Sequence, residues 1–200
     1  MKISCRISPD FPITLTHSSQ IMAIVSLRTY QSRIVAVAEN FNTVAVLPTG
    51  AGKTLIAAEL IKRRGGKSLF LVPTCMLVEQ QSGQLRSWTG MIVGEYMSGN
   101  TFPSHFDILV STPKAFETVL LRNQVSGWSS FRTVVFDEVH HVLKDHPYRK
   151  LALPNEIRIL GLTASVTYAV EENKVKTSMR RLCVTSSYKR WKLPLRLNCV

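Results

Sequence analysis

The segment 44–58 is the part of this 200-residue chain whose residue types most clearly indicate chemistry. An apolar run is followed by a Gly-rich turn and then by an apolar, Ala-rich stretch, which is typical of a strand, a tight turn and a helix. The residues of this candidate phosphate loop are Leu47, Pro48, Thr49, Gly50, Ala51, Gly52, Lys53 and Thr54. Glycines let the backbone bring its N–H groups up to phosphate oxygens, and the helix that follows presents its positive end to the same anion. We therefore expect a nucleoside triphosphate to bind here.

Two side chains of the loop have expected roles toward the phosphates. Lys53 can reach the β- and γ-phosphates, and the Thr54 hydroxyl can bind Mg²⁺. The general motif has a Gly five positions before its second Gly, where this chain has Leu47, so the strict pattern fails at its first residue. The alternative is a Gly-rich turn that leads into an ordinary helix without any ligand. The strand pattern before the turn and the helix pattern after it favour phosphate binding.

A second group of candidate residues follows the short apolar run at 133–136. This β-branched and aromatic segment is typical of a buried strand, and it ends in Asp137 and Glu138. Acids at the carboxyl end of a parallel strand lie at the edge of the sheet where ligands bind. Asp137 would hold Mg²⁺, largely through water, and Glu138 would orient and deprotonate the attacking water. The alternative is a solvated acidic turn, which the phosphate loop upstream disfavours.

The composition predicts one ordinary domain with a basic end. Hydrophobic residues make up 45% of the chain, which is enough to fill a core. The net charge is +12, from 25 Lys and Arg against 13 Asp and Glu, and it favours an anionic partner such as nucleic acid. Residues 174–200 contain eight basic and no acidic residues, which leaves only +4 for the first 173 residues. The basic end fits a solvated tail as well as a binding surface.

Cysteine spacing and hydropathy exclude several classes of protein. Cys5, Cys75, Cys183 and Cys199 are far apart, so neither a zinc site nor a disulfide framework is indicated. Reduced thiols favour a cytoplasmic location, or a nuclear one. No apolar stretch approaches the length of a membrane span, and the N-terminus is a poor match to a signal peptide. We expect no membrane partner.

Strand and helix patterns alternate along the chain. This alternation predicts an α/β fold, with a mostly parallel sheet that has helices on both faces. Ser26 is expected to cap the first helix. The expected helices cover 28–40, 55–64, 76–88, 113–122 and 170–182, and the expected strands cover 43–47, 68–72, 91–96, 108–111, 133–137 and 157–162.

Five segments in order resemble the motifs of one protein family. They are LPTGAGKT at 47–54, LVPTCMLVEQQ at 71–81, STPKAF at 111–116, DEVHH at 137–141 and LTAS at 162–165. Together they resemble the superfamily 2 DExD/H-box helicases over residues 27–165. The segments 27–31, 145–149 and 159–165 are similar to the branch that contains Dicer and the antiviral RNA sensors. The resemblance implies a RecA-like P-loop NTPase domain that uses ATP and Mg²⁺ and binds nucleic acid, above all double-stranded RNA.

The resemblance also implies roles for further residues. Gln31 would read adenine, and Arg28 or Tyr30 would pack on the base, although Tyr30 also fits a core position. Thr74 and Thr112 would contact nucleic acid backbone, or would simply cap the helices that follow them. The residues expected to couple the nucleotide to the nucleic acid are His140, Thr163 and Ser165.

Helicases of this superfamily close two RecA-like lobes over ATP, and the second lobe supplies arginines to the transition state. We expect residues 1–24 to be a loose leader, 25–185 to be the ATP-binding lobe and 186–200 to be a basic tail, with the second lobe absent. A missing transition-state arginine costs about 10³-fold or more in comparable NTPases. The chain is therefore expected to bind ATP weakly and hydrolyse it slowly, as a fragment or as the product of an incomplete gene model.

Two other functions stay open from the sequence. One is a non-catalytic module that binds ATP or RNA, and the other is a DNA translocase of the same superfamily. A transporter ATPase is disfavoured because the signature-like residues 81–84 lie far upstream of the acidic strand. A GTPase is disfavoured because the guanine-reading Asn-Lys-x-Asp motif is missing.

Overall fold

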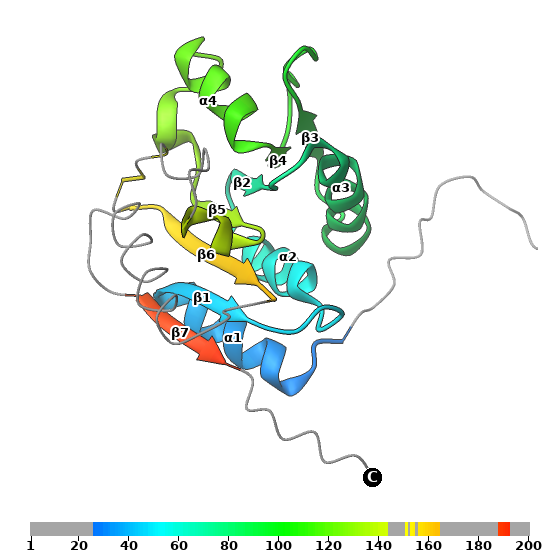
Figure 1. The fold of residues 1–200 in the computed structure, drawn as a ribbon, viewed down its shortest axis with the longest axis vertical. Helices are drawn as coiled ribbons and strands as arrows, with labels where there is room; N and C mark the ends of the chain where they lie inside the picture. Colours follow the sequence, from blue (N-terminus) through cyan, green and yellow to red (C-terminus); the bar gives the residue numbers. More distant parts are fainter. Residues whose placement is uncertain (1–25, 144–150, 152, 155, 165–187, 193–200) are drawn as a thin grey trace, which may run out of the picture.

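The computed structural model of the protein describes residues 26–143, 151, 153–154, 156–164 and 188–192 (Figure 1). The leader expected at 1–24 and the helix expected at 170–182 lie outside these residues. Each other expected strand and helix is present, with ends shifted by at most two residues. The observed elements are α1 (Thr29–Asn40), β1 (Asn42–Val46), α2 (Lys53–Arg64), β2 (Ser68–Leu71), α3 (Cys75–Thr89), β3 (Val93–Tyr96), β4 (Ile108–Ser111), α4 (Pro113–Leu121), η1 (Gly127–Ser130), β5 (Thr133–Phe136), η2 (Val139–Leu143), β6 (Arg158–Thr163) and β7 (Tyr188–Lys192).

The strands form one sheet in which all pairs are parallel. Their order across the described sheet is β3-β4-β2-β5-β6-β1-β7. The strand β6 therefore separates β1 from β5, and its register pairs Thr163 with Val46 and Gly161 with Phe136. Because the strands are parallel, their carboxyl ends meet at one edge of the sheet. The residues that follow β1, β5 and β6 are thereby brought together.

Each face of the sheet carries its own apolar layer, because successive side chains of a strand point to opposite faces. On one face, α1, α2 and α3 pack on side chains such as Phe70 and Val135. On the other face, α4 packs Phe116 against side chains such as Leu71 and Phe136. All four strand side chains are fully buried. Helices on both faces of a parallel sheet confirm the predicted fold class.

The start of the first helix differs from the prediction that Ser26 caps it. The N-cap is Arg28, whose backbone N–H donates to Gln31 Oε1 at 2.8 Å. A Gln at the third helical position can pair with the N-cap backbone in this way. The cap prediction was wrong because the helix begins at Thr29, which places Arg28 at the N-cap and leaves Ser26 two residues before it.

The strand β7 lies within 186–200, the segment expected to be a basic tail. Its residues pair in parallel with β1, from Asn42 with Tyr188 to Val46 with Lys192. Figure 1 shows β7 at the edge of the sheet beside β1. A boundary at residue 185 therefore leaves one strand of the sheet outside the domain.

Candidate functional site

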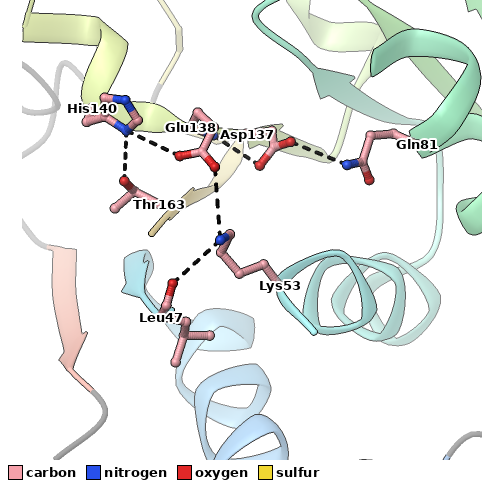
Figure 2. A network of polar contacts seen from close by, with 7 residues as sticks. All are labelled: Leu47, Lys53, Gln81, Asp137, Glu138, His140 and Thr163. Carbon is pink, nitrogen blue, oxygen red and sulfur yellow. Dashed lines mark hydrogen bonds and ion pairs between the residues drawn. The ribbon is translucent and has the colours of Figure 1, made fainter. Parts of the chain in front are cut away.

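The candidate site lies at the carboxyl edge of the sheet, where β1, β6 and β5 end side by side. The phosphate loop follows β1, Thr163 ends β6, and Asp137 follows β5. Figure 2 shows side chains from these three places directed toward one another. The sheet thus brings together the two groups of residues that the sequence singled out.

The phosphate loop turns sharply between β1 and α2. Gly50 has φ 79° and Gly52 has φ 72°, a left-handed conformation that side-chain-bearing residues rarely adopt. The turn is closed by a hydrogen bond from Ala51 N–H to Pro48 O at 3.2 Å. Gly52 is the N-cap of α2, so the helix begins at Lys53 and its positive end faces the loop. Pro48, Thr49 and Gly50 are exposed, which leaves their backbone accessible to a ligand.

The side chain of Lys53 extends from the start of α2 and lies between the end of β1 and the acidic turn after β5 (Figure 2). Its Nζ lies 3.5 Å from Leu47 O and 4.0 Å from Glu138 Oε1. Its side chain is 12% exposed, so the charge is held where it is only partly hydrated. Thr54 is the next residue of the helix and is half-buried.

Glu138 has an unusual backbone conformation. Its φ is 47°, in the left-handed region, which costs roughly 1–2 kcal/mol for a residue with a side chain. This conformation turns the chain from β5 into η2, and His141 N–H then donates to Glu138 O at 3.0 Å. The strained turn positions the Glu138 side chain next to both Lys53 and His140. Backbone strain of this kind is common at functional sites.

His140 connects the acidic turn to the end of β6. Its Nδ1 lies 2.9 Å from Thr163 Oγ1 and 3.3 Å from Glu138 Oε2. The close approach of η2 to β6 depends on Gly161, where a Cβ would lie 3.0 Å from a Val139 methyl group. His140 and Thr163 are therefore in direct contact, as coupling residues would be. The third predicted coupling residue, Ser165, lies outside the described residues.

Asp137 is the buried carboxylate of the site, with 6% of its surface exposed. Burial, and secondly the neighbouring Glu138 charge, raise its pKa from the usual 3.8 to about 6, although a hydrogen bond from Glu138 N–H and the Lys53 charge act in the opposite direction. Its Oδ1 accepts that bond at 3.0 Å. Its Oδ2 lies 3.5 Å from the Nε2 of Gln81, a buried residue of α3 to which the sequence analysis assigned no role.

Gln31 is buried beneath the phosphate loop. Its Nε2 donates to Ala51 O at 3.0 Å, and its Oε1 accepts from Arg28 N–H. Tyr30 Oη donates to the same Ala51 oxygen at 2.8 Å, whereas the Arg28 side chain is exposed. Tyr30 and Gln31 of α1 thus both hold the phosphate loop through Ala51 O. The adenine-reading role of Gln31 stays a prediction.

The residues of the site suit Mg²⁺ bound together with phosphates rather than a metal bound by protein alone. Among the described residues, no group of three or more His, Cys, Asp and Glu side chains is gathered to hold a metal ion. Mg²⁺ commonly takes one or two carboxylates and completes its shell with water and phosphate oxygens. Asp137 and Thr54 fit this need, and Gln81, whose Nε2 faces Asp137, has a buried Oε1 with no hydrogen-bond partner in the described part of the chain.

The two predicted nucleic acid contacts differ in their surroundings. Thr74 is the N-cap of α3, is exposed and makes no capping bond through its side chain. Thr112 is buried, and its hydroxyl caps α4 by accepting from Ala115 N–H at 3.4 Å. Thr74 is therefore open to a ligand, whereas Thr112 has the capping role that the sequence left as an alternative.

The chain matches a family model over most of its length. The model, described as type III restriction enzyme, res subunit, matches residues 15–167. The chain is 35% identical over 171 residues to endoribonuclease Dicer from Gallus gallus, with 72% of this chain covered. It is 32% identical over 193 residues to Dicer-like protein 1 from Aspergillus niger, with 78% covered. The chain spans only 9% and 13% of these two relatives.

Solved structures give the same assignment. The helicase domain of Hef from Pyrococcus furiosus superposes with a TM-score of 0.68 and 28% identity, covering 84% of this chain and 39% of that one. A hypothetical ATP-dependent RNA helicase from Sulfolobus tokodaii gives a TM-score of 0.67 and 25% identity, covering 84% of this chain and 53% of that one. The chain belongs to the res-subunit family of superfamily 2 helicase domains, in the branch that resembles Dicer, and the described part is a RecA-like ATP-binding lobe.

Two other predictions concern membranes and cysteines. Within the described ranges, no helix has both the length and the hydropathy needed to cross a bilayer. Cys75 is a free and exposed thiol. The other three cysteines lie outside the described residues.

Proposed function

We propose that this chain is the ATP-binding lobe of a Dicer-like RNA helicase or translocase, and that it couples ATP hydrolysis to the binding of double-stranded RNA. The observation that supports the proposal most is the 4.0 Å separation of Lys53 Nζ from Glu138 Oε1. A lysine that could bind phosphate and a glutamate that could accept a proton from water thus lie next to each other at one edge of the sheet. The relatives named Dicer support the choice of RNA.

Each residue of the site would act on a different part of the reaction. Lys53 would attract the β- and γ-phosphates, and the loop N–H groups would hold the same oxygens. Glu138 would orient the attacking water and accept its proton. Asp137 and Thr54 would hold Mg²⁺, which would offset the negative charge of the phosphates. Gln31 would select adenine.

Turnover would also need groups from outside this lobe. Arginines that stabilise the transition state contribute about 10³- to 10⁵-fold in related NTPases, and a second RecA-like lobe would supply them. Within this lobe, His140 and Thr163 would couple the state of the bound nucleotide to the nucleic acid site. Thr74 would contact RNA at that site. We place the protein in the cytoplasm or the nucleus.

The test is single-turnover ATP hydrolysis by the purified 200-residue chain. We expect slow hydrolysis that double-stranded RNA accelerates more than double-stranded DNA of the same sequence and length. Glu138→Gln should slow hydrolysis by about 10²-fold or more while it spares ATP binding. The matched control is Glu79→Gln, which changes an exposed glutamate on α3 and should leave the rate unchanged.

The outcomes separate the alternatives. Equal or greater stimulation by DNA would favour a DNA translocase. Saturable ATP or RNA binding with no hydrolysis above the rate measured without protein would favour a non-catalytic module. Protein-dependent hydrolysis that Glu138→Gln does not change would reject the assignment of Glu138.

A further inference from the structure

Gln81 is a buried amide that reaches from α3 to the acidic end of β5. It is 8% exposed, and its Nε2 lies 3.5 Å from Asp137 Oδ2 (Figure 2). An ionised carboxylate can only accept hydrogen bonds, so the NH₂ end of the amide is the end that suits this contact. The contact is long, as polar contacts at catalytic sites often are before a substrate is bound.

The other end of the same amide has no hydrogen-bond partner. Gln81 Oε1 is buried, and nothing in the described part of the chain donates to it. Buried polar atoms are nearly always paired in folded proteins, and an exception often marks a missing water or ion. Here the unpaired oxygen belongs to the side chain that faces the candidate Mg²⁺ ligand, so a donor that arrives with Mg²⁺ would satisfy it.

We propose that Gln81 is a positioning residue for metal-bound ATP. Its Nε2 holds the Asp137 carboxylate in orientation, and its Oε1 accepts a hydrogen bond from a water molecule of the Mg²⁺ hydration shell. The inference rests on the proposed function, because it needs ATP and Mg²⁺ to bind at the phosphate loop. Mg²⁺ gives up its waters reluctantly and usually keeps several of them, so a protein acceptor near the ion has waters to bind.

The two oxygens of Asp137 are then oriented from two sides. The backbone N–H of Glu138 donates to Oδ1 at 3.0 Å, and Gln81 faces Oδ2. Side chains that orient a metal ligand typically contribute about 10- to 100-fold to metal affinity or activity. Gln80, the preceding residue on the same helix, is exposed and provides a matched comparison.

The test measures the Mg²⁺ dependence of ATP binding by the full chain. A fluorescent ATP analogue is titrated in EDTA and then at rising Mg²⁺ with wild type, Gln81→Met, Gln81→Asn and Gln80→Met. Methionine keeps the unbranched shape and removes both polar atoms, whereas asparagine keeps the amide but shortens it by one methylene. We expect both Gln81 variants to raise the Mg²⁺ midpoint about tenfold while affinity in EDTA stays within twofold. Gln80→Met should match wild type.

Thermal unfolding of each variant shows whether the fold is retained, and Gln81→Asn serves if Gln81→Met does not fold. The inference is overturned if folded Gln81 variants keep the wild-type Mg²⁺ midpoint within twofold. It is also overturned if they lose affinity equally with and without Mg²⁺, because Gln81 would then only support the loop. Failure of the proposed function would appear differently, as an absence of saturable ATP binding by the wild type.

Discussion

Lys53 and Glu138 approach to 4.0 Å between Nζ and Oε1, although four strands and three helices begin between them in the sequence. The sheet order explains the approach, because only β6 separates β1 from β5. Both residues follow the carboxyl end of their strand, so the parallel arrangement places them at the same edge. The left-handed backbone of Glu138 then turns its side chain toward the phosphate loop. The following predictions test separate parts of this arrangement.

The charge of Lys53 should be required for ATP binding. We expect Lys53→Ala to weaken binding of an ATP analogue in Mg²⁺ by at least about tenfold, because one charge-assisted contact contributes about 1.5–3 kcal/mol. Lys62→Ala removes an exposed lysine from the same helix and should change affinity by less than twofold. Isothermal titration of both variants makes the comparison, and equal losses would contradict the role of Lys53.

The two glycines of the loop should differ in their tolerance of a side chain. Both have positive φ, so alanine should cost about 1–2 kcal/mol of stability at either position. A Cβ at Gly52 would also lie 2.5 Å from Gln31 Nε2, whereas Gly50 has nothing within 4 Å. We expect urea unfolding to show Gly52→Ala as the more destabilising change, by at least about 1 kcal/mol. A larger effect of Gly50→Ala would contradict the observed packing of Gln31.

Asp137 should make the ligand-free protein less stable as pH rises. Its pKa is about 6 in the folded chain and 3.8 ordinarily, so between these values the folded state holds a proton that the unfolded state releases. The free energy of unfolding should therefore fall through this window, by about 3 kcal/mol from this group. We expect Asp137→Asn to be more stable than wild type at pH 7.5 and similar at pH 4. If the difference in unfolding free energy between Asp137→Asn and wild type did not change with pH, the burial of Asp137 would be contradicted.

Gln31 should support the loop as well as adenine selection. Its amide makes two hydrogen bonds, to Ala51 O and from Arg28 N–H, and loss of a buried bond costs about 1–3 kcal/mol. We expect Gln31→Ala to lower the melting temperature by several degrees and to reduce the preference for ATP over GTP. Unchanged nucleotide preference with lowered stability would mean that Gln31 acts on the loop alone.

His140 and Thr163 should act together in the response to RNA. They are joined by a 2.9 Å contact between Nδ1 and Oγ1. We expect His140→Ala and Thr163→Val each to reduce stimulation of ATP hydrolysis by RNA while ATP affinity stays within about twofold. Because both remove the same contact, the double variant should be little worse than either single one. Additive losses in this double-mutant cycle would show that the two residues act separately.

The sequence predicted the site best where chemistry is local. The phosphate loop and the acids at 137–138 each form a short segment whose neighbours decide its conformation, and the strand at 108–111 is observed with the predicted ends. Gln81 lies in the family-like segment 71–81 but was assigned no role, because nothing in the neighbouring sequence shows what the amide of a helical glutamine contacts. Its role depends on Asp137, 56 residues away, and this separation is closed only by the packing of α3 on the sheet.

The edge of the sheet was also hard to predict. The residues of β7 are mostly basic, and a segment of that composition resembles a solvated tail. Its assignment as a strand depends on the free edge of β1, with which it pairs in parallel. The left-handed Glu138 could not be foreseen either, because only the contacts of the folded site compensate for its strain.

The central claim is that the loop at Lys53 and the acid at Asp137 bind one ATP and one metal ion. The most direct measurement uses Mn²⁺ in place of Mg²⁺. Electron paramagnetic resonance then records the hyperfine coupling between Mn²⁺ and the phosphorus nuclei of ATP bound to the full chain. We predict coupling to the β- and γ-phosphates in wild type, with the protein-bound signal lost in Asp137→Asn and in Lys53→Ala. A protein-bound Mn²⁺ signal that lacks phosphorus coupling, or that is unchanged in both variants, would contradict the account.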